Sequence, residues 1–127
     1  DNALSRGMFD GLKKNGAGYD VIGMSLYHSY ATTPWQTPNR QCLDNMTDMV
    51  TRYNKEVMVV EIGMPWDRAD ECKQIIADLM VKLKSVTGGK GIGLLYWEPQ
   101  CYGGWKGYTL GAFDNSGKPT VALDAFR

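Results

Sequence analysis

Side chains that could do chemistry follow three apolar runs of the sequence, at the point where each run ends. They are Tyr27 and His28 after the first run, Glu61 after the second, and Trp97 and Glu98 after the third. A carboxylate at the end of a buried segment loses much of its hydration energy, so its presence there calls for a partner or a task. Glu61 is therefore the strongest candidate for carboxylate chemistry, and a salt bridge to a neighbouring loop is the structural alternative.

Tryptophans accompany these acids. Trp35, Trp66 and Trp105 lie in the loops next to the runs, and Trp97 directly precedes Glu98. The C–H faces of sugars pack on indole rings while sugar hydroxyls bind carboxylates, so acids among tryptophans favour a carbohydrate site. The alternative is that the tryptophans anchor loops or fill the core.

Other chemistries lack the residues that they need. His28 is the single histidine, and Ser25 lies outside a GxSxG elbow. The three cysteines are widely spaced without a CxxC pair, and a zinc site would lack its second and third nitrogen or sulfur ligands. We therefore expect neither a metal nor a cofactor.

The elements that must position these residues alternate along the chain. The three runs are continuously apolar, and their cores start near residues 21, 57 and 92, which predicts strands of a parallel sheet covered on both faces. Amphipathic patterns predict helices at 4–14, 43–53 and 69–87, and a short one at 120–126. The predicted core face of the first helix is Leu4, Met8, Phe9 and Leu12, and that of the third is Cys72, Ile75, Ile76, Leu79, Met80 and Leu83.

This spacing predicts the last part of a (β/α)8 barrel. A strand recurs after 36 and then 35 residues, and a barrel of about 250 residues uses roughly 31 per unit. A small open α/β sheet is the alternative, but the glycines of "GAGYD" precede the first strand instead of following it. In either architecture the functional groups gather at the carboxyl ends of the strands.

Composition sets the remaining limits. The 127 residues suffice for one small domain, and 43% of them are apolar, as in folded proteins. Fourteen basic and fourteen acidic side chains cancel without a basic stripe, which argues against a nucleic-acid partner. The sequence holds no apolar run near the 20 or so residues that span a membrane.

Four segments together resemble a known family: "YDVIGMSLY", "RYNKEVMVVEIGMPW", "GIGLLYWEP" and "GAFDNSGKPTVALDAF". In order and spacing they resemble the C-terminal half of glycoside hydrolase family 53, the arabinogalactan endo-β-1,4-galactanases. The resemblance implies a retaining (β/α)8 glycosidase, secreted or periplasmic, that acts on β-1,4-galactan or arabinogalactan. Residues 1–127 would then be an incomplete catalytic domain with strands 6 to 8.

The resemblance also implies roles for single residues. Glu61 would be the nucleophile at the end of strand 7, with Tyr27 near it at the end of strand 6, and Trp97 would floor the subsite at the cleavage point. Glu98 would contact substrate or support the site. Further expected substrate contacts are His28, Tyr30, Trp66 and Trp105. The family's strand-6 motif differs here, because "SLYHSYA" carries Tyr30 in place of a tryptophan.

The resemblance leaves one carboxyl group outside the chain. A retaining glycosidase needs two about 5 Å apart, and the family carries its acid/base on strand 4. The chain is therefore expected to be inactive alone, unless Glu98 serves as the second carboxylate. Rival functions are another retaining glycosidase of the same clan and a non-catalytic carbohydrate-binding fragment.

The same incompleteness predicts a partner for the sheet. Without the other strands, part of the barrel lining would lose its cover, and the open edges should pair with the N-terminal half or with a second copy. The residues expected to lose cover are Val21, Ile22, Met58, Val60, Leu94 and Tyr96.

Overall fold

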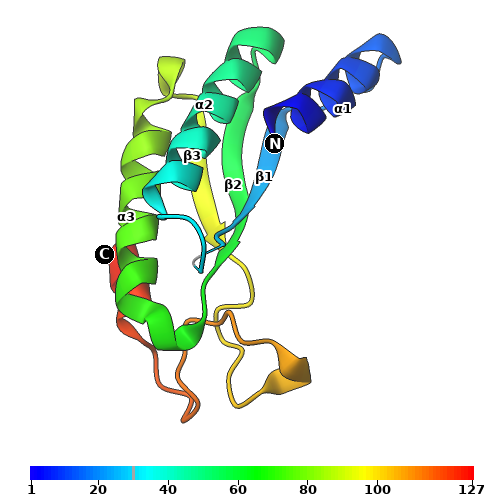
Figure 1. The fold of residues 1–127 in the computed structure, drawn as a ribbon. Helices are drawn as coiled ribbons and strands as arrows, with labels where there is room; N and C mark the ends of the chain where they lie inside the picture. Colours follow the sequence, from blue (N-terminus) through cyan, green and yellow to red (C-terminus); the bar gives the residue numbers. More distant parts are fainter. Residues whose placement is uncertain (30) are drawn as a thin grey trace.

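Three strands and three α-helices alternate in the computed structural model, which describes residues 1–29 and 31–127 (Figure 1). The helices are α1 (Asn2–Lys14), α2 (Gln36–Tyr53) and α3 (Ala69–Ser85), and the strands are β1 (Val21–Tyr27), β2 (Glu56–Gly63) and β3 (Gly91–Tyr96). A 3₁₀ helix, η4 (Val121–Phe126), occupies the place of the predicted last helix and packs against α3.

The strands form a parallel sheet in the order β1-β2-β3, as the spacing predicted. Helices α2 and α3 lie side by side on one face of this sheet (Figure 1). Their apolar faces bury alternate residues in β1 and in the first half of β2. The fully buried side chains in this layer include Ile22, Met46, Met49, Val57, Val59, Ile62, Ile75, Ile76 and Leu79.

The opposite face of the sheet carries no helix in the described part of the chain, so the prediction of cover on both faces is wrong there. Val21 and Tyr27 are exposed on this open face, and so is Leu95 on β3. The prediction that Ile22, Leu94 and Tyr96 would lose cover is also wrong. Side chains of a strand alternate between faces, and these three point to the helix layer and belong to the core or pack against it.

The helices largely follow the predicted patterns. All six predicted core residues of α3 are buried or half-buried, and Asp70 and Glu71 in its first turn complement the helix dipole. Helix α2 begins at Gln36 rather than near residue 43.

Helix α1 ends at Lys14 as predicted, but it begins at Asn2 rather than Leu4 and packs differently. Leu4 is 74% exposed and Met8 56%, because α1 extends away from the sheet and contacts mainly α2 (Figure 1). The residue that anchors it is Phe9, whose ring lies 5.3 Å from that of Tyr19 and 5.8 Å from that of Tyr53. The predicted core face of α1 is therefore buried only in its second half.

Candidate active site

A β-bulge in β2 turns Glu61 toward the open face of the sheet. Met24 of β1 pairs with Val59 and Ser25 pairs with Glu61, so Val60 is the extra residue. Strict alternation would place Glu61 on the helix side with Val57 and Val59, which are fully buried. Because of the bulge, the side chain of Ile62 faces the helices, and that of Glu61 is half-buried on the open face of the sheet.

Gly23 makes room for this bulge. A Cβ atom at Gly23 would lie 2.7 Å from Cγ1 of Val60, a distance that real Cβ atoms do not show. The absence of a side chain on β1 therefore accommodates the extra residue of β2, and with it the direction of Glu61.

The hydroxyl of Tyr27 donates a hydrogen bond to Oε2 of Glu61 at 3.2 Å. The two side chains come from neighbouring strands and meet at the carboxyl end of the sheet, where the sequence predicted the functional groups. Burial, together with Tyr108 and Glu61, raises the pKa of Tyr27 far above its ordinary value. Tyr27 therefore remains a protonated donor throughout the neutral range.

Tyr108 comes from the loop after β3, and no pattern in the sequence pointed to it. Its hydroxyl donates to the backbone carbonyl of Trp97 at 3.5 Å. The charges of Glu61 and Glu98 both act on Tyr108, and burial is the main reason that its pKa is raised. The Tyr108 hydroxyl, 3.4 Å from the Cβ position of Gly63, thus lies at the carboxyl end of β2.

Trp97 and Glu98 begin a tight turn directly after β3. Trp97 is 45% exposed, and its N–H donates to the carbonyl of Ile62 at 2.9 Å. Glu98 has a φ of +49°, a left-handed conformation that is uncommon outside glycine, and its carbonyl accepts from the N–H of Cys101. The Cys101 thiol lies 3.5 Å from Oε2 of Glu98, and burial and this carboxylate raise the thiol's pKa.

Two hollows flank this turn and hold the other predicted tryptophans. One, of about 440 Å³, has Trp66 and Tyr108 in its lining, and the other, of about 360 Å³, has Trp105 and Glu98. Tyr102 lines both. The ammonium group of Lys106 lies 4.8 Å from the ring centre of the exposed Trp105. Aromatic rings and a carboxylate therefore surround two adjacent depressions.

His28 lies apart from this group. It is 6% exposed, and its Nε2 lies 2.8 Å from Oδ1 of Asn39 on α2. The amide nitrogen of Asn39 donates to the carbonyl of Ile75 and to Asp78, so its oxygen accepts from His28. Burial lowers the pKa of His28, which keeps the ring neutral while it ties the end of β1 to α2 and α3. Tyr30 falls outside the described residues.

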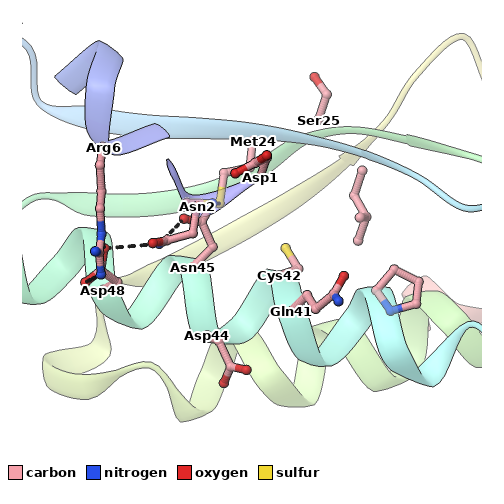
Figure 2. A pocket seen from close by; sticks show the side chains of 12 residues that line it. Asp1, Asn2, Arg6, Met24, Ser25, Gln41, Cys42, Asp44, Asn45 and Asp48 are labelled. Carbon is pink, nitrogen blue, oxygen red and sulfur yellow. Dashed lines mark hydrogen bonds and ion pairs between the residues drawn. The ribbon is translucent and has the colours of Figure 1, made fainter. Parts of the chain in front are cut away.

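A cavity of about 750 Å³, larger than either hollow, lies elsewhere, between α1, α2 and β1 (Figure 2). Asp48 in its wall is ion-paired with Arg6 at 2.8 Å and with Arg52 at 3.0 Å. The Arg6 guanidinium is the main reason that the pKa of Asp48 is held far below its usual range. Two arginines already neutralise the charge of Asp48, so this carboxylate is not available to act on a ligand in the cavity.

In residues 1–29 and 31–127, no group of three or more His, Cys, Asp or Glu side chains is arranged to hold a metal ion. None of the helices in this part of the chain is long and apolar enough to cross a membrane.

Comparison with known proteins places the site in a family context. Residues 1–75 match the profile of glycosyl hydrolase family 53. Over 77% of its length the chain is 32% identical to an arabinogalactan endo-β-1,4-galactanase of Humicola insolens, and over 95% it is 30% identical to an uncharacterized protein from the bgaB 5′ region of Niallia circulans. It spans 32% and 38% of these two relatives.

A solved structure confirms the predicted fold class. A fungal β-1,4-galactanase, 22% identical, superimposes with a TM-score of 0.78 over 99% of the chain and 44% of its own length. The three parallel strands and their helices are thus part of a TIM barrel.

Proposed function

Because the chain belongs to glycosyl hydrolase family 53, we propose that it is the C-terminal part of a glycosidase domain that cleaves β-1,4-galactan or arabinogalactan. The observation that carries this proposal is the Tyr27–Glu61 hydrogen bond at the carboxyl end of the sheet, where the exposed Trp97 is bonded through its N–H to the carbonyl of Ile62, next to Glu61. A carboxylate with one neutral donor and an open aromatic surface suits attack on a bound sugar.

Each residue has a role in this proposal. Glu61 is the nucleophile of a retaining mechanism, and Tyr27 orients it. Trp97 floors the sugar at the cleavage point, while Trp66 and Trp105 contact neighbouring sugars in the two hollows. Glu98 contacts substrate or supports the site. His28 is buried, so it supports the end of β1 through its hydrogen bond to Asn39 and does not contact the sugar.

The proposed mechanism needs a second carboxyl group about 5 Å from Glu61 to protonate the leaving oxygen. The family pattern puts this acid/base on strand 4, which the 127 residues do not include. The chain by itself is then inactive, and the remaining barrel strands complete the site. If Glu98 were the acid/base instead, the chain alone would retain some turnover.

The open face and the two free edges of the sheet are the proposed contact with those strands. Val21 and Leu95 are exposed on this face, and β1 and β3 each have one unpaired edge. The N-terminal half of the barrel would cover them, and a second copy of the chain is the alternative partner. Light scattering that shows a clean monomer at high concentration counts against self-association. A secreted or periplasmic location belongs to the same proposal.

The experiment compares hydrolysis of β-1,4-galactan by the full-length protein that carries this sequence, by the 127-residue chain, and by Glu61→Gln variants of both. We expect cleavage by the full-length protein, its loss in Glu61→Gln, and none by the chain alone. Normal activity of the full-length Glu61→Gln variant would remove Glu61 as nucleophile. Binding of galactan without cleavage would instead favour a carbohydrate-binding role, which the exposed tryptophans also suit.

A further inference from the structure

Tyr102 is a wall that the two hollows after β3 share. It lines the hollow of about 440 Å³ together with Trp66, and it lines the hollow of about 360 Å³ together with Trp105. Tyr102 is 51% exposed, so much of its surface remains open to a ligand. A chain-like ligand that occupies both hollows therefore meets Tyr102 on its way from one to the other.

The base of the loop after β3 fixes the backbone from which Tyr102 leaves. The N–H of Ala112 donates to the carbonyl of Pro99 at 2.7 Å. A Cβ at Gly111 would lie 2.2 Å from the carbonyl oxygen of Cys101, so a glycine is needed for the two ends of the loop to approach this closely. Tyr102 directly follows this closed base, and its starting point is thus defined.

A second turn holds the ring of Tyr102 from one side. Oδ1 of Asp114 organises this turn, since it accepts from the N–H groups of Ser116 at 2.8 Å and of Lys118 at 3.0 Å. Gly117 of the turn has a φ of +78°, and a Cβ there would lie 3.0 Å from Cζ of Tyr102. The missing side chain lets the ring pack directly on the turn. One side of the ring is therefore held by backbone, while Tyr102 stays half exposed.

The exposed surface of Tyr102 suits a galactose unit. Galactose carries an axial hydroxyl at its fourth carbon, and the face away from this hydroxyl presents C–H groups that pack on aromatic rings. Linkage through the axial position bends a β-1,4-galactan at each sugar, whereas the equatorial linkage of a β-1,4-glucan gives a straight chain. Two adjacent hollows with a ring as their common wall fit the bent chain better than a straight one.

We propose that Tyr102 is a specificity-determining residue that contacts galactan sugars in both hollows and selects a bent chain; this rests on the proposed function. The packing on Gly117 already restricts the ring, so little side-chain freedom is lost when a sugar binds. The contact is the same in the ground state and in the transition state, so it lowers KM and leaves kcat unchanged. A purely structural Tyr102 would need only its apolar bulk against the turn.

The kinetic test uses Tyr102→Leu in the full-length protein with β-1,4-galactan as substrate. Leucine keeps apolar bulk against Gly117 but has no flat face. We expect KM to rise roughly fivefold, the loss of one aromatic contact, while kcat changes by less than about twofold. Tyr102→Phe keeps the ring and should keep the wild-type KM.

Phe126→Leu is the matched control. It makes the same exchange at a residue of η4 that is 43% exposed and, in the described part of the chain, lines neither hollow. Its KM should equal that of the wild type. An unchanged KM in Tyr102→Leu, or an equal rise in Phe126→Leu or Tyr102→Phe, would overturn the proposal.

A binding measurement provides a readout that needs no turnover. Calorimetry in the Glu61→Gln background should show the Kd of β-1,4-galactotetraose rise roughly fivefold when Tyr102→Leu is added. Cellotetraose, a straight β-1,4-glucan of the same length, should bind the Glu61→Gln variant at least about tenfold more weakly than galactotetraose. Equal affinity for the two tetrasaccharides would contradict the selection of a bent chain.

The outcomes separate this inference from the proposed function. Wild-type protein that neither binds nor cleaves galactan refutes the proposed function, and the role of Tyr102 with it. If wild-type protein cleaves galactan and Glu61→Gln does not, but Tyr102→Leu keeps the wild-type KM and Kd, the function stands and only the role of Tyr102 is refuted.

Discussion

Two partly buried carboxylates, Asp48 on α2 and Glu61 on β2, differ in what surrounds them. Asp48 accepts hydrogen bonds from Arg6, Arg52 and Asn2, so its charge is neutralised by two guanidinium groups. Glu61 accepts from the neutral hydroxyl of Tyr27, and in the described part of the chain no cation lies within ion-pair distance of it. The first carboxylate is committed to holding helices together, and the second keeps its charge available.

This difference is a better guide to function than cavity size. The cavity of about 750 Å³ adjoins Asp48 (Figure 2), whereas the hollows at the end of the sheet that carries Glu61 have volumes of about 440 and 360 Å³. A carboxylate already paired with arginines is a poor nucleophile, since attack would have to disrupt those pairs. The partners of a charged group therefore tell more about its task than the space beside it.

The largest expected effect is the loss of activity in Glu61→Gln. An amide cannot form the covalent glycosyl intermediate, so kcat of the full-length protein on galactan should fall by roughly 10⁴-fold. Asp48→Asn is the matched carboxylate control and should keep kcat within about twofold, as measured by reducing-sugar release. An equal loss of kcat in Glu61→Gln and Asp48→Asn would show that the two carboxylates do not differ in function.

Gly23→Ala should produce the next largest effect. The new Cβ clashes with Val60 and strains the bulge that directs Glu61, at a cost of about 1–3 kcal/mol in the free energy of unfolding. The double variant Gly23→Ala, Val60→Ala removes the clashing methyl groups. Urea denaturation should show part of the stability restored, and a double variant no more stable than the single one would refute this account of the bulge.

Asp48→Asn should lower stability by about 1 kcal/mol at neutral pH, since its arginine partners lie near the surface. The folded-state pKa of Asp48 lies below its unfolded value, so the pairing stabilises the protein above about pH 4 and the gain is lost as the pH falls further. Urea denaturation of both proteins from pH 7 to pH 3 should show a constant difference down to about pH 4 and a smaller one at pH 3. A difference that grows on acidification would have the wrong sign.

The smallest expected effect belongs to Arg52→Ala. Arg6 still neutralises Asp48 in this variant, so only an i,i+4 pair on the helix surface is lost, worth about 0.3–0.5 kcal/mol. Thermal unfolding at low and high salt should show the difference fade as salt rises. A larger loss than in Asp48→Asn would mean that Arg52, rather than Arg6, is the main partner.

The sequence predicted the elements whose apolar pattern is strong. Helix α3 and the three strands follow from runs of buried residues, and their order follows from their spacing. The sequence did not predict the beginning of α2, because its first turns hold Pro38 and several polar residues. Proline is nevertheless tolerated in the first turn of a helix. The exposure of Leu4 and Met8 depends on which neighbours α1 has, and a periodic pattern does not reveal them.

The site was predictable only in part, for a related reason. Glu61 and Tyr27 stand at strand ends, which the sequence marks. The four residues of "VMVV" are alike, so the sequence does not show which of them forms the bulge. Tyr108 is far from Glu61 in the sequence and lies near it only because the loop after β3 folds back. The burial of His28 depends on Asn39, a partner in a part of α2 that the sequence did not reveal as helix.

The loop after β3 is fixed at its two ends, so its middle can vary in length and sequence. The bond between Ala112 and Pro99 and the tight approach of Gly111 to Cys101 close the loop at its base, so residues 102–107 form an excursion whose length can change at little entropic cost. Insertions between Gly103 and Gly107 would reshape both hollows without moving Tyr108. Under the proposed function, variation in this excursion would change which sugars the hollows contact while Glu61 keeps its direction.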